Sequence, residues 1–339
     1  MTTSGAHNKV NIIAEVGSVH DGSLGNALCL IRVAAECGAD AVKFQTHIAA
    51  AETLPDAPCP PYFKGEPRYA YFERTGFSPE QWAQLKAECE TVGIEFLSSP
   101  FSEEAVALLD KLGVARYKVP SGEITNIPLL DAVGRTGKPV LLSSGMSTWL
   151  ELDEAVATIR AYHSRLALLQ CTTQYPCPPE RVGLNVLAEM RARYDLPVGL
   201  SDHTLTNEAA FAAVALGAAV IEKHLTFSRR MYGSDAPHSL EPAEFADLAR
   251  GVRAVEAMLR SPVDKDAVNE LATMKRTFEK SIVALVDIPV GSVLAADMLG
   301  MRKPGTGLPG RRFKEILGRR TTSPIAKGAM IREDDLTDA

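Results

Sequence analysis

The residues best suited to chemistry in this sequence are two histidines, His203 and His224, each of which follows a short apolar run. Between the two runs, residues 207–216 are alanine-rich with helical periodicity, so the stretch 199–224 predicts a strand, a loop, a helix and a second strand. Adjacent strands of a parallel sheet end at the same edge, so we expect the two imidazoles to lie close together. Neutral imidazoles bind Mn, Fe, Co or Zn ions, which makes the pair a candidate metal site, although two unrelated loop histidines would give the same pattern.

Polar residues also follow the other short apolar runs of this region. In chain order they are Glu15, Lys43, Gln45, Ser99, Lys118, Ser121, Glu123, Ser143, Ser144, Thr172, Thr173, Tyr175, Ser201 and Asp202, with Asp235 on the loop after His224. Two lysines and several hydroxyls directed at one place suit a phosphate group, and carboxylates suit proton transfer. Each residue alone has an ordinary alternative as a rim lysine, a turn serine or a helix-terminal glutamate. The prediction therefore rests on their joint occurrence.

These residues must be positioned by strands and helices, and the sequence patterns of the two alternate regularly in this region. Strands are expected at residues 10–16, 41–44, 94–98, 116–119, 140–142, 166–170, 197–200 and 219–222. Eight such units predict an α/β fold, the (β/α)8 TIM barrel, whose functional residues lie at the carboxyl ends of the strands. A doubly wound open sheet is the alternative, but no G-x-G-x-x-G motif follows the first strand.

The character of the sequence changes after residue 260. Residues 1–260 are expected to form the barrel, residues 261–280 are polar and predict a linker, and residues 281–339 contain short apolar runs divided by glycine and proline. The last pattern predicts a small β-rich domain that would be marginally stable alone. Within the barrel, residues 46–75 are rich in proline and aromatic residues and predict an irregular loop.

Composition excludes several classes of partner. The 339 residues are 46% hydrophobic and 23% charged, with a net charge of −6, which is typical of a globular protein that binds neither nucleic acid nor an anionic membrane. No apolar run is long enough to span a membrane, and residues 1–9 lack the apolar core of a signal peptide. Six cysteines without a C-x-x-C pair are expected to be free thiols, so we expect a cytoplasmic protein.

Eight motifs, in the same order along the chain, resemble the sialic acid synthase (N-acetylneuraminate synthase) family. They are residues 12–15 (IIAE), 38–46 (GADAVKFQT), 98–101 (SSPF), 117–123 (YKVPSGE), 142–146 (LSSGM), 171–176 (CTTQYP), 199–204 (GLSDHT) and 222–224 (EKH). The resemblance implies condensation of phosphoenolpyruvate with an amino sugar, and an antifreeze-like (SAF) domain after the barrel. It also implies a homodimer in which the small C-terminal domain of one subunit caps the partner's barrel.

The resemblance further implies a role for individual residues. His203 and His224 would bind a divalent metal, manganese by the family pattern, with magnesium or cobalt as alternatives. Phosphoenolpyruvate would be bound by Lys43, Lys118, Ser121, Ser143 and Ser201, with Ser99 adjoining. The sugar would be contacted by Gln45, Tyr175 and Asp235, with Thr173 where the family often has asparagine. Glu15 would transfer a proton, and Glu123 would lie near the attacking water.

Some positions depart from the family pattern, and they concern the sugar. Residues 19–22 read VHDG where Asn-His-Asn/Glu-Gly is usual, and residues 231–239 differ from the common Gly-Pro-Asp-His form. The arginine that would reach the partner's sugar falls on Lys303, with Arg302 one position out of register. The loop 55–76 is expected to cover the sugar with Tyr62, Phe63, Lys64, Arg68, Tyr69 and Tyr71, and a mobile rim loop without this role is the alternative.

The expected function is metal-dependent condensation of phosphoenolpyruvate with N-acetylmannosamine or a related amino sugar, which gives a sialic (nonulosonic) acid and phosphate. A synthase for another nonulosonic acid, of the legionaminic or pseudaminic type, is the nearest alternative. A Schiff-base aldolase that uses Lys43 or Lys118 and a non-catalytic sugar-binding protein are the others.

Overall fold

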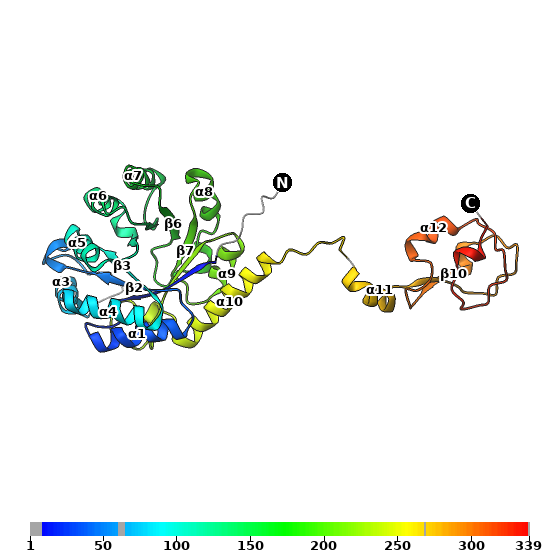
Figure 1. Ribbon diagram of the computed structural model, residues 1–339, viewed down its shortest axis with the longest axis horizontal. Helices are drawn as coiled ribbons and strands as arrows, with labels where there is room; N and C mark the ends of the chain where they lie inside the picture. Colours follow the sequence, from blue (N-terminus) through cyan, green and yellow to red (C-terminus); the bar gives the residue numbers. More distant parts are fainter. Residues whose placement is uncertain (1–8, 60–64, 268, 338–339) are drawn as a thin grey trace. The chain divides into compact units, whose positions relative to one another are not determined.

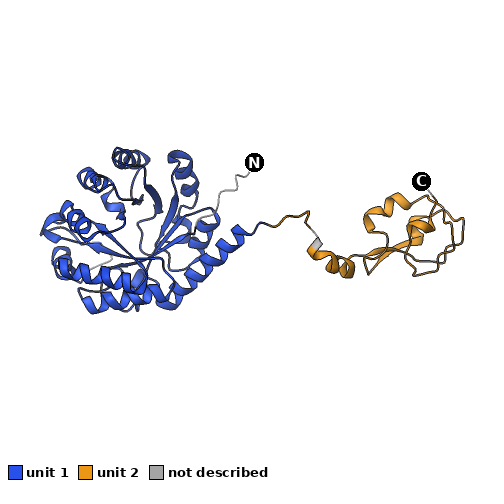
Figure 2. Ribbon diagram, viewed as in Figure 1, with its two compact units in different colours: residues 1–262 blue, residues 263–339 orange. Residues whose placement is uncertain are grey.

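The computed structural model describes residues 9–59, 65–267 and 269–337. The chain folds into two compact units, and the boundary between them falls after Pro262 (Figure 2). No helix in these described ranges is both long enough and apolar enough to cross a membrane. All six cysteines are free, as predicted, and Cys29 is exposed.

The first unit is a ring of eight parallel strands surrounded by helices (Figure 1). The strands are β1 (Asn11–Gly17), β2 (Ala41–Thr46), β3 (Glu95–Pro100), β4 (Tyr117–Val119), β5 (Val140–Ser143), β6 (Leu166–Cys171), β7 (Val198–Asp202) and β8 (Val220–His224). Their order in the sheet is β3-β2-β1-β8-β7-β6-β5-β4, and the two edge strands β3 and β4 pack against each other to close the ring. The predicted TIM barrel is therefore confirmed.

Eight long helices follow the strands. They are α1 (Leu24–Glu36), α4 (Pro79–Val92), α5 (Glu103–Leu112), α6 (Ile127–Arg135), α7 (Trp149–Arg160), α8 (Asn185–Tyr194), α9 (Glu208–Ala215) and α10 (Pro242–Arg260). The prediction of an irregular stretch at 46–75 was wrong in part, because α2 (Ala49–Glu52) and α3 (Arg68–Thr75) lie within it. Prolines and scattered aromatic residues interrupt the apolar pattern by which a short helix could be predicted there. Helix α3 begins directly after Pro67.

The second unit has its own small core. A two-stranded antiparallel sheet, β9 (Ser281–Ala284) and β10 (Leu299–Arg302), packs with α12 (Phe313–Ile316) around buried aliphatic residues. This confirms the predicted β-rich unit. The predicted linker contains α11 (Ala272–Phe278), which belongs to the second unit, and there the Gly305 N–H donates to the Arg276 carbonyl at 2.8 Å.

Alternation of side chains along the strands gives the barrel an apolar floor. The inward-facing floor consists of Ile13, Ala41, Leu97, Leu141, Leu169 and Val220. Two positions further along the same strands stand Glu15, Lys43, Ser99, Ser143, Cys171 and Glu222. The polar residues therefore form the next inward layer, toward the carboxyl ends of the strands.

A buried charged pair also lies on the outward face of the sheet, next to this polar layer. Lys223 of β8 pairs with Asp202 of β7 at 2.5 Å, and both side chains are 1% exposed. The Lys223 ammonium also donates to the Thr204 hydroxyl at 3.0 Å. Because the two strands are in register at these positions, the pair ties β7 to β8 on the helix side of the sheet.

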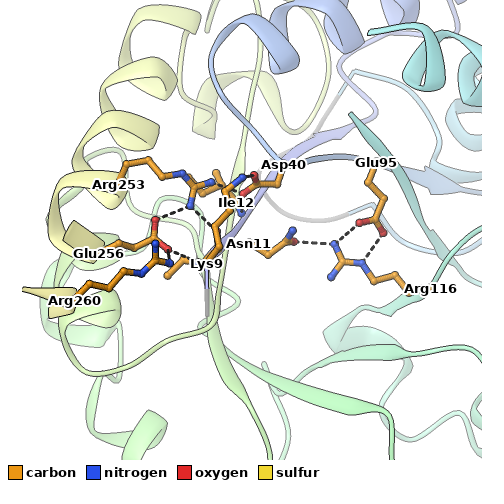
Figure 3. A network of polar contacts seen from close by, with 10 residues as sticks. Lys9, Asn11, Ile12, Asp40, Glu95, Arg116, Arg253, Glu256 and Arg260 are labelled. Carbon is orange, nitrogen blue, oxygen red and sulfur yellow. Dashed lines mark hydrogen bonds and ion pairs between the residues drawn. The ribbon is translucent and has the colours of Figure 1, made fainter. Parts of the chain in front are cut away.

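The amino ends of the strands carry a separate polar network (Figure 3). Asp40, just before β2, accepts a hydrogen bond from the Ile12 N–H at 2.8 Å and pairs with Arg253 of α10 at 2.5 Å. Glu256 of α10 accepts from the Val10 N–H and from Arg253. The last helix of the barrel is thereby fastened to its first strand.

Arg116 joins the two strands that close the ring (Figure 3). In the described chain no hydrogen-bonded ladder joins β3 to β4. Instead, the Arg116 guanidinium lies before β4 and donates to both carboxylate oxygens of Glu95 at 2.7 and 3.1 Å, and to Asn11 Oδ1 at 2.8 Å. A half-buried bidentate pair of this kind is stronger than an exposed one.

We predict that Arg116→Ala lowers the free energy of unfolding by about 2 kcal/mol, because it leaves Glu95 without its partner at the seam. Urea unfolding followed by tryptophan fluorescence measures the barrel specifically, since Trp82 and Trp149 both lie in the first unit. Lys86→Ala, which removes an exposed helix pair, is the control and should cost less than about 0.5 kcal/mol. Equal effects of the two variants would contradict the role of Arg116 in closure.

Candidate active site

The polar layer opens into a cavity of about 250 Å³ at the carboxyl ends of the strands. Of the predicted site residues, the cavity is lined by Glu15, Lys43, Gln45, Lys118, Ser121, Ser143, Thr173, Tyr175, Ser201, His203, His224 and Asp235. These residues come from strands β1, β2, β4, β5, β7 and β8 and from loops that follow strands. The barrel therefore brings together residues that are up to 220 positions apart (Glu15 and Asp235, 235 − 15).

A buried carboxylate, Glu222, lies at the centre of the charges in this cavity. Its Oε1 atom accepts hydrogen bonds from Lys118 Nζ and from Ser201 Oγ, both at 3.0 Å. Lys43 Nζ is 3.7 Å from the same oxygen and 2.7 Å from Glu15 Oε2. All five side chains are buried, so two ammonium groups and two carboxylates share one water-poor space.

The protonation states follow from burial and from these pairings. Burial acts to raise the pKa of Glu222, but Lys118 and Lys43 more than offset it and lower the pKa to about 2. Burial raises the pKa of Glu15, and the neighbouring Lys43 offsets this only in part. Burial lowers the pKa of Lys118, against the attraction of Glu222. Glu15 is therefore the more basic of the two carboxylates.

Glu222 was not among the predicted site residues. It stands two positions before His224 on β8 and opposite Ser201 of β7 in the register, so it faces the same side as both. Because side chains alternate between the two faces of a strand, the spacing of two residues from His224 could have identified Glu222 as a site residue from the sequence. The cavity is also lined by residues for which the sequence predicted no role in the site: Ser18, His47, Phe72, Phe101, Met146, Cys171 and Ser234.

Several buried polar atoms of the cavity have no hydrogen-bond partner among the described residues. They include Ser143 Oγ, Glu222 Oε2 and His224 Nδ1. Buried polar groups are nearly always satisfied in folded proteins, so orphaned atoms that face one cavity indicate a bound polar ligand or ion. The unsatisfied set combines a hydroxyl, a carboxylate oxygen and an imidazole nitrogen.

The two predicted metal ligands lie side by side. The ring centroids of His203 and His224 are 5.6 Å apart. His203 Nδ1 lies 2.8 Å from the carbonyl oxygen of Thr172, so Nδ1 carries the proton and donates, which leaves Nε2 free to bind a metal. Burial lowers the pKa of His224 to about 4 despite the nearby Asp235, so that ring is neutral.

These two rings fit a divalent cation that keeps open positions. Within residues 9–59, 65–267 and 269–337, His, Cys, Asp and Glu form no metal-binding group of three or more. If a metal binds here, the two imidazoles would supply nitrogen ligands, and substrate or water would supply the remainder. Catalytic metal sites leave positions open in this way.

The predicted sugar-side residues meet around the loop after β1. Asp235 Oδ2 accepts a hydrogen bond from the Ser18 N–H at 3.0 Å. Gly17 has φ +54°, and a Cβ atom there would lie 2.3 Å from the same carboxylate oxygen, so only glycine fits. Gln45 Nε2 donates to Glu15 Oε1 at 2.8 Å, and the Tyr175 ring lies 4.2 Å from that of His203.

Several predicted residues of the barrel do not line the cavity, namely Ser99, Glu123, Ser144, Thr172 and Asp202. Ser99 is completely buried behind it and accepts a hydrogen bond from Lys43 at 3.2 Å. Glu123 lies in a short 3-10 turn, where its carboxylate accepts from Asn126 Nδ2 at 2.7 Å. Arg302 and Lys303 belong to the second unit, where the Lys303 ammonium lies 4.9 Å from the Phe278 ring centroid. Their predicted roles stay predictions.

The predicted sugar-covering loop is described in part. Arg68 and Tyr71 of α3 line the cavity, whereas Tyr69 does not. Tyr62, Phe63 and Lys64 lie outside the described residues.

We predict that Glu222→Gln lowers the free energy of unfolding by about 3 kcal/mol, because buried Lys118 would lose its ion-pair partner and buried Lys43 would keep only its pair with Glu15 among the described ion pairs. Thermal unfolding of the full chain measures this, and inorganic phosphate should recover part of the loss by binding the lysines. The control is Glu189→Gln on the exposed face of α8. A Glu222→Gln protein as stable as this control would contradict the charge balance.

Comparison with known proteins places the chain in a family. The NeuB family profile matches residues 30–264, and the SAF domain profile matches residues 279–337. The chain is 35% identical to the N,N'-diacetyllegionaminic acid synthase of Campylobacter jejuni over 333 residues, which cover 96% of this chain and 99% of that protein. It is 36% identical to the human N-acetylneuraminate-9-phosphate synthase, over 95% of this chain and 91% of that one.

A solved structure agrees with these relatives. The N-acetylneuraminic acid synthetase of Leptospira borgpetersenii, in complex with citrate, is 31% identical and superposes with a TM-score of 0.70, covering 81% of this chain and 95% of that chain. Fold, order of motifs and sequence identity all point the same way. The chain therefore belongs to the NeuB family of nonulosonic acid synthases and carries a C-terminal SAF domain.

Proposed function

We propose that this enzyme condenses phosphoenolpyruvate with N-acetylmannosamine or a related amino sugar, in a reaction that requires a divalent metal and releases phosphate. One observation carries the proposal. Two buried lysines, an unsatisfied serine hydroxyl and two imidazole rings face a single cavity. The names of the relatives, which are synthases for legionaminic acid and for N-acetylneuraminate 9-phosphate, support the same class of reaction.

Phosphoenolpyruvate is the substrate that suits the lysine side of the cavity. Lys43 and Lys118 supply positive charge for its phosphate and carboxylate in a site with little water, where charge-assisted hydrogen bonds are strongest. Ser121, Ser143 and Ser201 add hydroxyl donors, and Ser143 Oγ has no other partner among the described residues. Ser99 holds Lys43 from behind.

The amino sugar suits the histidine side. His203 and His224 would hold the metal, for which we propose manganese, with magnesium or cobalt as alternatives. When bound, it would polarise the carbonyl group of the open-chain sugar. Gln45, Tyr175 and Asp235 orient the sugar, and Thr173 also lines the cavity.

The proposed reaction forms one C–C bond and breaks one C–O bond. C3 of phosphoenolpyruvate adds to the aldehyde carbon of the sugar, and water adds to C2. The bond between C2 and the phosphate oxygen then breaks, and phosphate leaves. The sugar oxygen takes up one proton and the added water releases one, and we place Glu15 to transfer this proton because it is the more basic carboxylate of the cavity.

We expect phosphate release from phosphoenolpyruvate to require both an amino sugar and a divalent metal, and to stop when a chelator is added. A panel of acceptors ranks N-acetylmannosamine, its 6-phosphate, and precursors of legionaminic and pseudaminic acid. Release without a sugar, or full activity in chelator, would contradict the proposal. Covalent trapping with pyruvate and borohydride would instead indicate a Schiff-base aldolase.

His224→Ala should lower turnover by roughly a hundredfold or more, because one of two protein ligands of the metal is lost. Titration calorimetry with Mn²⁺ gives a readout that does not depend on activity, and the variant should lose the binding event. His163→Ala, outside the cavity, is the matched control. Unchanged Mn²⁺ binding in His224→Ala would rule out the proposed ligands.

We also propose a homodimer in which the SAF domain of one subunit completes the partner's site through Arg302 or Lys303. If the proposal holds, inactive His224→Ala protein mixed with an inactive Arg302→Ala/Lys303→Ala protein regains activity, because mixed dimers contain one intact site. Sedimentation checks that dimers form. Dimers that mix without any recovery would contradict the exchange.

A further inference from the structure

A continuous row of hydrogen bonds leads from α2 into the cavity. Glu52 of α2 faces His47 Nδ1 with both carboxylate oxygens, at 2.9 and 3.1 Å. His47 Nε2 is 3.0 Å from Gln45 Oε1, and Gln45 Nε2 donates to Glu15 Oε1 at 2.8 Å. Lys43 then pairs with the other oxygen of Glu15 at 2.7 Å. None of the family motifs noted above includes His47 or Glu52.

Aromatic rings hold His47 in place. Its ring stacks on Phe72 of α3 at 3.8 Å with an interplanar angle of 8°, and on Phe101 at 4.1 Å on the other side. The side chains of His47 and Glu52 are 5% and 6% exposed. A ring packed on both faces keeps its two nitrogens aimed at fixed partners.

The oxygen atoms that face His47 give this row of hydrogen bonds a direction. Both nitrogens of His47 face oxygen atoms, those of the Glu52 carboxylate and of the Gln45 amide carbonyl, and this geometry suits a ring that donates from both nitrogens. The other charged or titratable groups that act on this region are Glu123, Arg68 and His20. If the ring were neutral, Nε2 would accept, and the Gln45 amide would turn its carbonyl toward the Glu15 carboxylate.

We propose that the Glu52–His47 pair is a positioning unit for the acceptor sugar: it fixes the Gln45 amide with its NH2 group toward Glu15 and the cavity. Gln45 then offers the sugar a hydrogen-bond donor and not an acceptor. The pair thus selects an acceptor that presents an oxygen lone pair at this point. The inference rests on the proposed function in so far as Gln45 binds the sugar.

The test is His47→Phe together with Glu52→Gln, which keeps the aromatic stack and leaves no buried carboxylate unpaired. We expect the KM for the acceptor sugar to rise about tenfold, because one or two hydrogen bonds to the sugar are lost. The KM for phosphoenolpyruvate should stay within twofold. Thermal unfolding checks that the variant is folded. His163→Phe is the same exchange outside the cavity and should change neither KM.

A spectroscopic measurement tests the same proposal without turnover. In full-length protein labelled with 15N-histidine, the His47 ring, assigned by its loss in His47→Phe, should carry protons on both nitrogens at neutral pH. Glu52→Gln should convert it to a ring with one proton.

Two results would overturn the proposal. One is a singly protonated His47 in the unmodified enzyme, and the other is an unchanged acceptor KM in the folded double variant. If the unmodified enzyme turned over no acceptor at all, the proposed function would fail, and the protonation of His47 would still decide this inference.

Discussion

Glu222 is the group on which the rest of the site depends. Lys43 and Lys118 come from β2 and β4, yet both direct their ammonium groups at one carboxylate oxygen of β8. Two buried ammonium ions without this counterion would repel each other at a cost of several kcal/mol. Because the carboxylate is ionised and shared, the barrel can keep two lysines ready for an anionic substrate before that substrate arrives.

The charged groups at the two ends of the barrel have different roles. At the amino ends, Asp40, Glu95 and Glu256 are paired with arginines, and these contacts fasten the first strand, the last helix and the seam. At the carboxyl ends, charged groups are paired in part and several polar atoms are left without partners. The apolar floor separates the two regions, so polar groups of the site remain available to ligands while the fold is held elsewhere.

Much of this could be predicted from sequence because it follows local periods. Alternation within each strand and the strand–helix repeat were enough to predict the barrel and to place His203, His224 and both lysines at one end. Glu222 and His47 were not predicted as site residues, because their roles arise from partners on other elements, such as Lys118 of β4 and Phe72 of α3. The helices α3 and α11 were missed since short helices beside proline or in polar stretches lack a clear apolar stripe.

The buried pair of Asp202 and Lys223 has a consequence for how this family of barrels can evolve. Each residue directly follows one that faces the cavity, Ser201 and Glu222 respectively, so β8 carries opposite charges on its two faces. Deletion of a single residue in β8 would turn Lys223 into the cavity and Glu222 toward the helices, which would give the site a third cation and leave Asp202 facing another anion. New acceptor preferences are therefore expected to arise by insertion and exchange in the loops, while the strands tolerate substitution but no change in length.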